Sequence, residues 1–147
     1  MKPGRLLLAG LVTGLVMNIG EAVLHGALLA ESARSAYAAL HLTAVDDPIY
    51  LVSLLAVTFA QGILMAWLYS VLRPRFGSRS TAAVCVGLVA WFLSSVYAAA
   101  YLYSGFPGIL PAKLIWAPVA WQLIEYPLAM FAGAAVTKEA TLSFPRE

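Results

Sequence analysis

Charged residues are scarce in this sequence. They make up 11% of its 147 residues, whereas they account for about a quarter of an ordinary soluble domain. Hydrophobic residues make up 62%. This composition excludes an ordinary soluble domain and predicts an all-α integral membrane protein surrounded by the lipid bilayer. The net charge of +2 is too small to indicate a nucleic-acid partner.

Cysteine and histidine are also rare, and the familiar catalytic motifs are missing. The single cysteine, Cys85, excludes an intramolecular disulfide. The sequence has no recognisable Ser/His/Asp or Cys/His set and no phosphate-binding loop. It also lacks the Glu-x-x-His pairs of di-metal bundles and the His-Glu-x-x-His motif. We therefore predict a protein that is not an enzyme.

A metal-dependent membrane enzyme remains as an alternative. Glu21 and His25 place two types of metal ligand on one helical face, and Glu125 offers a third. Haem or chlorophyll would require a histidine such as His25, but the sequence offers no second axial ligand at membrane depth. The sequence therefore assigns neither a metal nor a cofactor.

Four apolar runs are long enough to cross the hydrocarbon core as helices. They cover about residues 6–30, 49–72, 81–104 and 113–137. The first run is longer than the apolar part of a signal peptide and is interrupted by polar residues, so we expect it to be retained. We predict a single membrane domain over residues 1–147 that folds as an up-down four-helix bundle.

The charges in the links predict an orientation. Basic residues precede the first run and crowd the link between the second and third: Lys2, Arg5, Arg73, Arg75 and Arg79. The link after the first run contains the acids Glu31, Asp46 and Asp47. The positive-inside rule then places both termini in the cytoplasm. The pattern looks generically like small four-helix membrane proteins of bacteria, which implies a bacterial-type inner (cytoplasmic) membrane.

The link between the first and second runs has its own helical pattern. Small and apolar residues recur in it at helical spacing: Ala33, Ala36, Tyr37 and Leu40. We predict a short amphipathic helix that lies at the outer membrane interface. Asp46, Asp47 and Pro48 then form a start signal for the second membrane helix, because Asp caps helices and proline fits the first helical position.

The first run carries a stripe of small and polar residues: Gly10, Gly14, Asn18, Glu21 and His25. Steps of three and four residues place all five on one helical face. An ionisable group at membrane depth costs roughly 2.5–3.5 kcal/mol even on lenient insertion scales. We therefore expect this stripe to face protein or water and not lipid.

The fourth run carries a matching stripe: Gln122, Glu125, Ala129 and Gly133. At a rise of about 1.5 Å per residue from the outer helix ends, Glu21 and Gln122 both lie ~13–14 Å deep. Asn18 and Glu125 both fall near ~18 Å, and Gly14 and Ala129 near ~24 Å. We predict that the first and fourth helices are neighbours, with the small residues in close contact and both glutamates in one water-accessible layer.

The other two helices contribute to the same polar layer. Gln61 in the second run and Ser94 or Ser95 in the third fall at about the same depth. One interpretation is structural, because polar side chains hydrogen-bond across membrane helices at about 0.6 kcal/mol on average. The other interpretation is functional. Glu21, His25 and Glu125 would bind an ion, a proton or a polar ligand.

Two functions correspond to these interpretations. The first is a non-enzymatic accessory or scaffold subunit of a larger membrane assembly, whose partners are other membrane protein subunits or further copies of this chain. Small size and the lack of an inverted repeat favour this function. The second is a small proton- or ion-coupled carrier, for which we expect at least one of Glu21 and Glu125 to be protonated near neutral pH.

Overall fold

The computed structural model describes residues 2–42 and 48–137. Within these residues all regular elements are helical and no strand is found. Three helical segments are long and apolar enough to cross a membrane: Pro3–Leu28, Leu51–Arg75 and Arg79–Gly105. The all-helical membrane protein that the composition predicts is supported at this level of detail.

The first predicted run corresponds to two elements joined without a break. Helix α1 (Pro3–Val23) continues into the π-helical segment η1 (Leu24–Leu28). Proline suits the first turn of a helix because its missing N–H needs no partner there. In η1 the N–H group of Leu29 donates to the carbonyl of Leu24 at 2.8 Å. This bond spans five residues, whereas an α-helical bond spans four.

Helix α2 (Ala30–Ala39) follows directly, and it covers most of the predicted amphipathic segment. Its Ala36 is buried, whereas Glu31 and Arg34 on the other face are exposed. The predicted start signal at Asp46 and Asp47 lies outside the described residues. The next helix, α3 (Pro48–Leu72), begins at the predicted proline.

The third predicted run is a continuous helical rod with a π-helical centre. A short 3₁₀ turn, η2 (Arg73–Arg75), ends α3. The rod then consists of α4 (Arg79–Trp91), the π-helical segment η3 (Phe92–Val96) and α5 (Tyr97–Gly105). Ser78 caps α4, because its hydroxyl accepts a hydrogen bond from the N–H group of Thr81 at 3.0 Å.

The last helix, α6 (Ala112–Ala135), is 24 residues long. It is not one of the three segments that are long and apolar enough to cross a membrane, and it contains Gln122, Glu125 and two prolines. The guanidinium group of Arg79 donates to the carbonyl oxygens of Ala134 and Thr137, both at 2.7 Å. These bonds tie the start of α4 to the carboxyl end of α6, where helical carbonyl groups lack intrahelical α-type partners.

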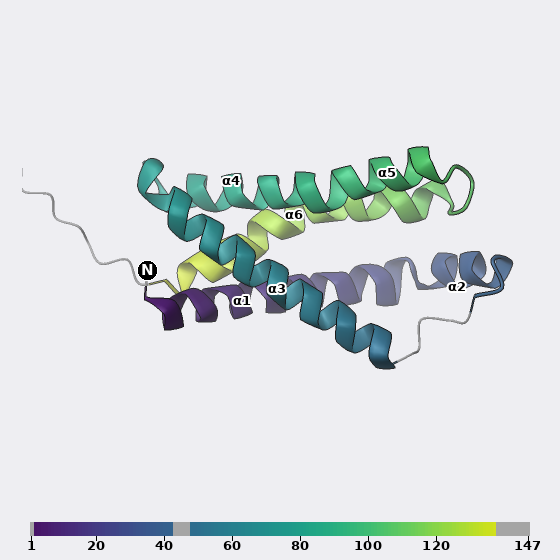
Figure 1. Cartoon of the computed structure of the whole chain (residues 1–147), viewed down its shortest axis with the longest axis horizontal. Coiled ribbons are helices and arrows are strands. Elements are labelled where there is room, and N and C mark those ends of the chain that lie inside the picture. Colours follow the sequence, from purple (N-terminus) through teal and green to yellow (C-terminus); the bar gives the residue numbers. More distant parts are fainter. Residues whose placement is uncertain (1, 43–47, 138–147) are drawn as a thin grey trace, which may run out of the picture.

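Figure 1 shows that successive long helices run in alternating directions. One end of the molecule holds the start of α1, the α3–α4 connection and the end of α6, while α2 and the α5–α6 turn lie at the opposite end, called here the α2 end. Helix α1 packs against α3 and α6, and α4 packs against α6. The sequence stripes predict the contact of α1 with α6.

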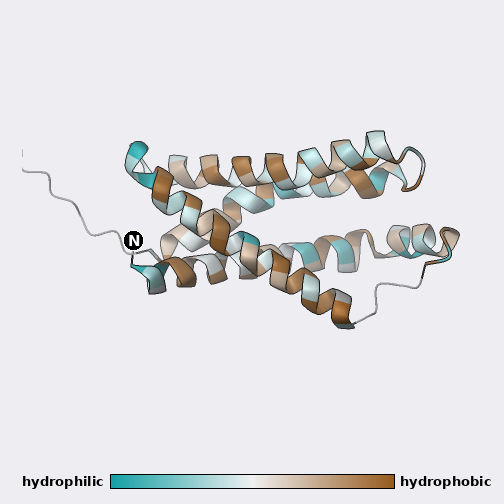
Figure 2. Ribbon diagram, in the orientation of Figure 1, coloured by the Kyte–Doolittle hydropathy of each residue, from teal (hydrophilic) through white to brown (hydrophobic). Residues whose placement is uncertain are grey.

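The first half of α3 departs from a regular bundle. It leads away from the other helices toward the α2 end (Figure 1), and residues 51–57 are all exposed. Figure 2 shows hydrophobic colours along much of α3, and hydrophilic patches within α1 and α6. The second half of α3 holds buried residues such as Met65 and Tyr69. The described core therefore lies in the half of the molecule away from the α2 end.

Glycines allow the helices to approach closely in this core. A Cβ atom added to Gly62 on α3 would lie 2.5 Å from the backbone nitrogen of Gly14 on α1. A Cβ atom added to Gly87 on α4 would lie 2.6 Å from the Cα atom of Pro127 on α6. Both distances are shorter than side chains tolerate, so these contacts require glycine.

The structure pairs the small residues differently from the sequence-based expectation. Gly10 and Gly14 face α3, because the atoms nearest to a Cβ atom at these positions belong to Ile63 and Phe59. Gly133 instead lies against Thr13 and Ala9 of α1. Two adjacent stripes of α1 therefore share the packing, one facing α3 and the other facing α6.

Candidate functional site

The polar residues of α1 form a pair near the α2 end. The imidazole Nε2 of His25 in η1 lies 3.1 Å from the carboxylate Oε2 of Glu21 in α1. The side chain of His25 is 49% exposed, whereas that of Glu21 is only 17% exposed. This pair therefore leads from the surface of the molecule toward its interior.

Gln122 connects this pair to two further elements. Its amide Nε2 donates a short hydrogen bond to Oε1 of Glu21, and its Oε1 accepts one from the hydroxyl of Ser95 at 2.5 Å. Glu21 and Gln122 are the pair for which the sequence predicts equal depth. The bonds join α1, α6 and η3, and they fix the orientation of the Glu21 carboxylate.

Glu125, one turn further along α6, is in a different environment. Its side chain is buried, with the residue 7% exposed. Within the described part of the chain, neither of its carboxylate oxygens makes a hydrogen bond of regular geometry, and the same is true of Trp121 Nε1, the indole donor that acts on this carboxyl group. Most buried polar groups in proteins are hydrogen-bonded, and an unsatisfied one costs about 1–3 kcal/mol. Glu125 is therefore an exception that packing alone does not explain.

Gly20 provides the space that Glu125 occupies. A Cβ atom at position 20 would lie 2.5 Å from the carboxyl carbon of Glu125 and 2.6 and 2.8 Å from its two oxygens. Glu21, the residue that follows Gly20, acts electrostatically on Glu125, so the two carboxyl groups belong to one site. The site thus combines a buried carboxyl group with a second, partly exposed one that acts on it electrostatically.

A second polar group lies beside the first. Gln61 Nε2 of α3 donates to the hydroxyl of Ser94 in η3 at 3.0 Å, and Ser94 lies 3.5 Å from the hydroxyl of Tyr126 in α6. Ser94 and Ser95 both belong to the π-helical segment η3, and His25 belongs to η1. Short π-helical segments within α-helices occur frequently at functional sites.

Asn18 is not joined to this group. Its amide Nδ2 donates to the carbonyl of Gly14 in its own helix at 2.8 Å. Glu125 lies opposite Gly20 and not opposite Asn18, which is the residue that the depth estimate matched with it. The other residues predicted for the polar layer take part in the contacts described above: Glu21, His25, Gln61, Gln122 and Glu125.

Sequence reasoning did not identify Gly20, Trp121 or Tyr126. A signal for Gly20 exists, because Ala9, Thr13 and Gly20 are separated by four and seven residues and therefore share one helical face. That face is the one that meets α6. Trp121 and Tyr126 lack such a signal, since aromatic residues are common in membrane helices of this composition.

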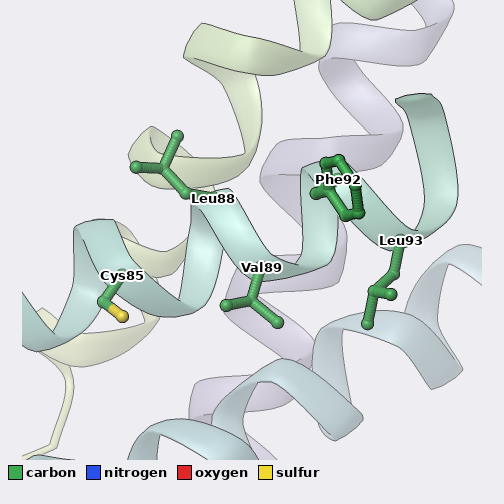
Figure 3. A pocket seen from close by; sticks show the side chains of 5 residues that line it. All are labelled: Cys85, Leu88, Val89, Phe92 and Leu93. Atoms are coloured by element: carbon green, nitrogen blue, oxygen red, sulfur yellow. The ribbon is translucent and has the colours of Figure 1, made fainter. Parts of the chain in front are cut away.

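The structure gives no indication of a metal centre in residues 2–42 and 48–137, where no group of three or more His, Cys, Asp or Glu side chains is placed to hold a metal ion. A groove elsewhere, on the face of α4 and η3, is lined by hydrophobic side chains and one thiol (Figure 3): Cys85, Leu88, Val89, Phe92 and Leu93. It offers no charged group to a polar ligand. The polar chemistry is therefore at Glu21, His25 and Glu125.

Comparison of the chain with protein-family models, with curated proteins and with solved structures finds no match. The functional argument therefore depends on the site itself: a surface imidazole, a hydrogen-bonded carboxylate behind it, and a buried carboxyl group that makes no hydrogen bond of regular geometry.

Proposed function

We propose that this protein is a small proton-binding membrane protein of the proton-coupled carrier type, and that Glu125 is the group that holds the proton. The observation that carries this proposal is the buried carboxyl group of Glu125, whose oxygens make no hydrogen bond of regular geometry in the described structure. A carboxylate charge at such a place is costly, whereas the protonated acid is neutral. Proton binding removes this cost. A role in helix packing alone does not require proton binding.

The ligand is a proton because the surroundings of Glu125 do not suit a larger cation. Its carboxyl group packs against the backbone of Gly20, and a metal ion would need several ligands at once. Glu21 is already bonded to Gln122 and His25. A proton needs only one oxygen of Glu125 and no further space.

The membrane arrangement that accompanies this proposal has four spans. Helix α6 forms the fourth, since it lies against α1 and α4 along its length of 24 residues. We further propose that both termini and the arginines Arg73, Arg75 and Arg79 lie on the cytoplasmic side of a bacterial-type inner membrane. The α2 end then faces outward.

Infrared spectroscopy of the protein in lipid nanodiscs tests the proton-binding function. A titration should reveal a carbonyl band of a protonated carboxylic acid, which disappears at high pH. Glu125→Gln should abolish this band. Glu31→Gln is the matched control, because Glu31 is exposed on α2 and its replacement should leave the band intact. A wild-type protein without the band, or a band that persists in Glu125→Gln, would contradict the proposal.

A second candidate function is that of an accessory or scaffold subunit in a larger membrane assembly. One observation favours it: the hydrogen bond between Gln61 and Ser94 lies at an exposed position beside the unpartnered first half of α3. Polar groups at membrane depth usually face protein or water. A helix of a partner subunit, or of another copy of this chain, would cover them.

Native mass spectrometry after mild solubilisation tests the subunit function. A stable complex that dissociates when Leu55 in the exposed half of α3 is replaced by Arg would support it. A wild-type protein that is monomeric at all detergent concentrations would contradict it. Leu7→Arg is the control, because Leu7 is an exposed residue on α1, outside the proposed interface.

A further inference from the structure

The exposure of the ionisable side chains at the site decreases from His25 through Glu21 to Glu125. His25 is half-exposed, Glu21 is mostly buried, and Glu125 is buried. His25 Nε2 lies 3.1 Å from Glu21 Oε2, which is within reach for direct proton transfer. The residue after Gly20 is Glu21, and Gly20 touches the Glu125 carboxyl group. The three ionisable groups therefore form a series from the surface inward.

Gln122 orients the middle member of this series. It donates its hydrogen bond to Oε1 of Glu21, so Oε2 is the oxygen that faces His25. Ser95 in turn holds the other end of the Gln122 amide. Gln122 is thus a positioning residue, because it acts on the proton only through the orientation of Glu21.

The opposite side of Glu125 is closed by packing. Beyond it α1 and α6 meet at Thr13 and Gly133, with room for no side chain between them. The buried residues next to this contact are hydrophobic: Met17, Ala129 and Met130. The described residues place no ionisable side chain in this contact. Among the described residues, the polar side chains that connect Glu125 with the surface therefore lie toward the α2 end.

We propose that protons reach Glu125 from the α2 end through His25 and Glu21. This inference rests on the proposed function, and it adds the route and the groups that form it. His25 takes a proton from water on Nε2 and transfers it to Oε2 of the Glu21 carboxylate. The Glu21 carboxylic acid then transfers its proton to an oxygen of Glu125. At the end His25 is neutral, Glu21 is a carboxylate again, and Glu125 carries the proton.

Few other titratable groups compete for this route. In the part of the chain that the structure describes, Glu21 is the ionisable side chain that acts electrostatically on Glu125. The remaining titratable side chains on the helices around it, away from the ends of the helical segments, are Tyr126 on α6, Tyr69 on α3, Cys85 on α4 and the exposed Tyr97 at the start of α5. The hydroxyl of Tyr126 lies near Ser94, and Tyr69 is buried in the hydrophobic core.

A pH-jump experiment with infrared detection tests the route. The wild-type protein in nanodiscs is shifted rapidly from high to low pH, and the rise of the carboxylic acid band is followed. His25→Ala should slow this rise by at least ~10-fold, since it removes the group that collects the proton. Added imidazole should restore the rate. His41→Ala is the matched control, because His41 is exposed and lies outside the series.

The possible results separate the route from the function. If His25→Ala and His25→Gln both show the band rising at the wild-type rate, the route is wrong while proton binding stands. If the wild-type protein shows no band at equilibrium, the proposed function itself fails. Two variants are used because glutamine keeps a polar side chain of similar size where alanine removes it, so a folding defect in one does not decide the result.

Discussion

Gly20 on α1 lies directly against the carboxyl group of Glu125 on α6, so that a Cβ atom at position 20 would come within 2.5 Å of the carboxyl carbon. The contact joins a backbone without a side chain to a buried acid that makes no hydrogen bond of regular geometry. It also holds Glu125 within electrostatic reach of Glu21. The proposed site depends on this relationship more than on any single hydrogen bond.

Replacement of Gly20 by alanine should displace Glu125 without unfolding the protein. The atoms that the new methyl group meets belong to the end of a flexible side chain, which can move, and alanine favours a helix over glycine by about 1 kcal/mol. We expect faster labelling of Glu125 by dicyclohexylcarbodiimide, which adds to protonated carboxyl groups, because the displaced acid is more accessible. Mass spectrometry of the labelled peptide measures this rate.

Gly26→Ala is the control for this experiment. Nothing lies within 4 Å of a Cβ atom at position 26, so the labelling rate of Glu125 should stay at the wild-type value. Equal labelling rates for Gly20→Ala and the wild type would show that the contact between Gly20 and Glu125 does not confine the carboxyl group.

Gly62→Ala should destabilise the protein more than either of these changes. Its new methyl group would meet backbone atoms of Gly14 and Gly10 at 2.5–2.8 Å, and backbone cannot move without separating α1 from α3. Overpacking of this kind costs about 1–3 kcal/mol. Reversible unfolding in mixed detergent micelles measures the loss. An unfolding free energy equal to that of Gly26→Ala would contradict the close packing of these helices.

The sequence predicts the helices and part of the polar site well. Apolar length alone places the first run at residues 6–30, and the structure has helix from Pro3 to Leu28. Depth along each helix predicts which polar residues meet, and the bonds of Glu21 with Gln122 and of Gln61 with Ser94 follow these depths. Rise per residue is a fixed property of helices, so such estimates hold within about a turn.

Helix facing is harder to predict than helix position. On α1 the stripe with Gly10 and Gly14 and the stripe with Ala9 and Thr13 are displaced by one residue, or about 100°. Both consist of small residues, so either could meet α6. The choice depends on how α3 and α6 pack together around α1, which no single-helix pattern contains. For the same reason the face that Gly20 shares with Ala9 and Thr13 does not by itself reveal that Gly20 meets Glu125.

A cross-linking experiment distinguishes the two facings. In a Cys85→Ser background, Thr13→Cys combined with Gly133→Cys should form a disulfide rapidly, because these positions are in contact across α1 and α6. The two Cβ atoms of a disulfide lie roughly 3.5–4.5 Å apart. Gly14→Cys with Ala129→Cys should link slowly, since Gly14 faces α3. Faster linking of the second pair, detected by gel mobility, would favour the facing predicted from the sequence.

The last prediction concerns the coupling of Glu21 to Gln122. Gln122→Ala removes the donor to Glu21 and leaves Ser95 without its acceptor, so it should lower the unfolding free energy. Glu21→Ala removes the acceptor of the same hydrogen bond. In a double-mutant cycle, residues that share a hydrogen bond couple by about 0.5–3 kcal/mol. We expect a value in this range from unfolding measurements at neutral pH.

The same cycle measured between Glu21 and Asn18 provides the comparison. Asn18 bonds to its own helix at Gly14, so Asn18→Ala should act independently of Glu21→Ala, and the two effects should add. Additivity for the pair Glu21 and Gln122 would mean that the short hydrogen bond contributes nothing. The Glu21 carboxylate would then lack the fixed orientation toward His25 on which the proton route depends.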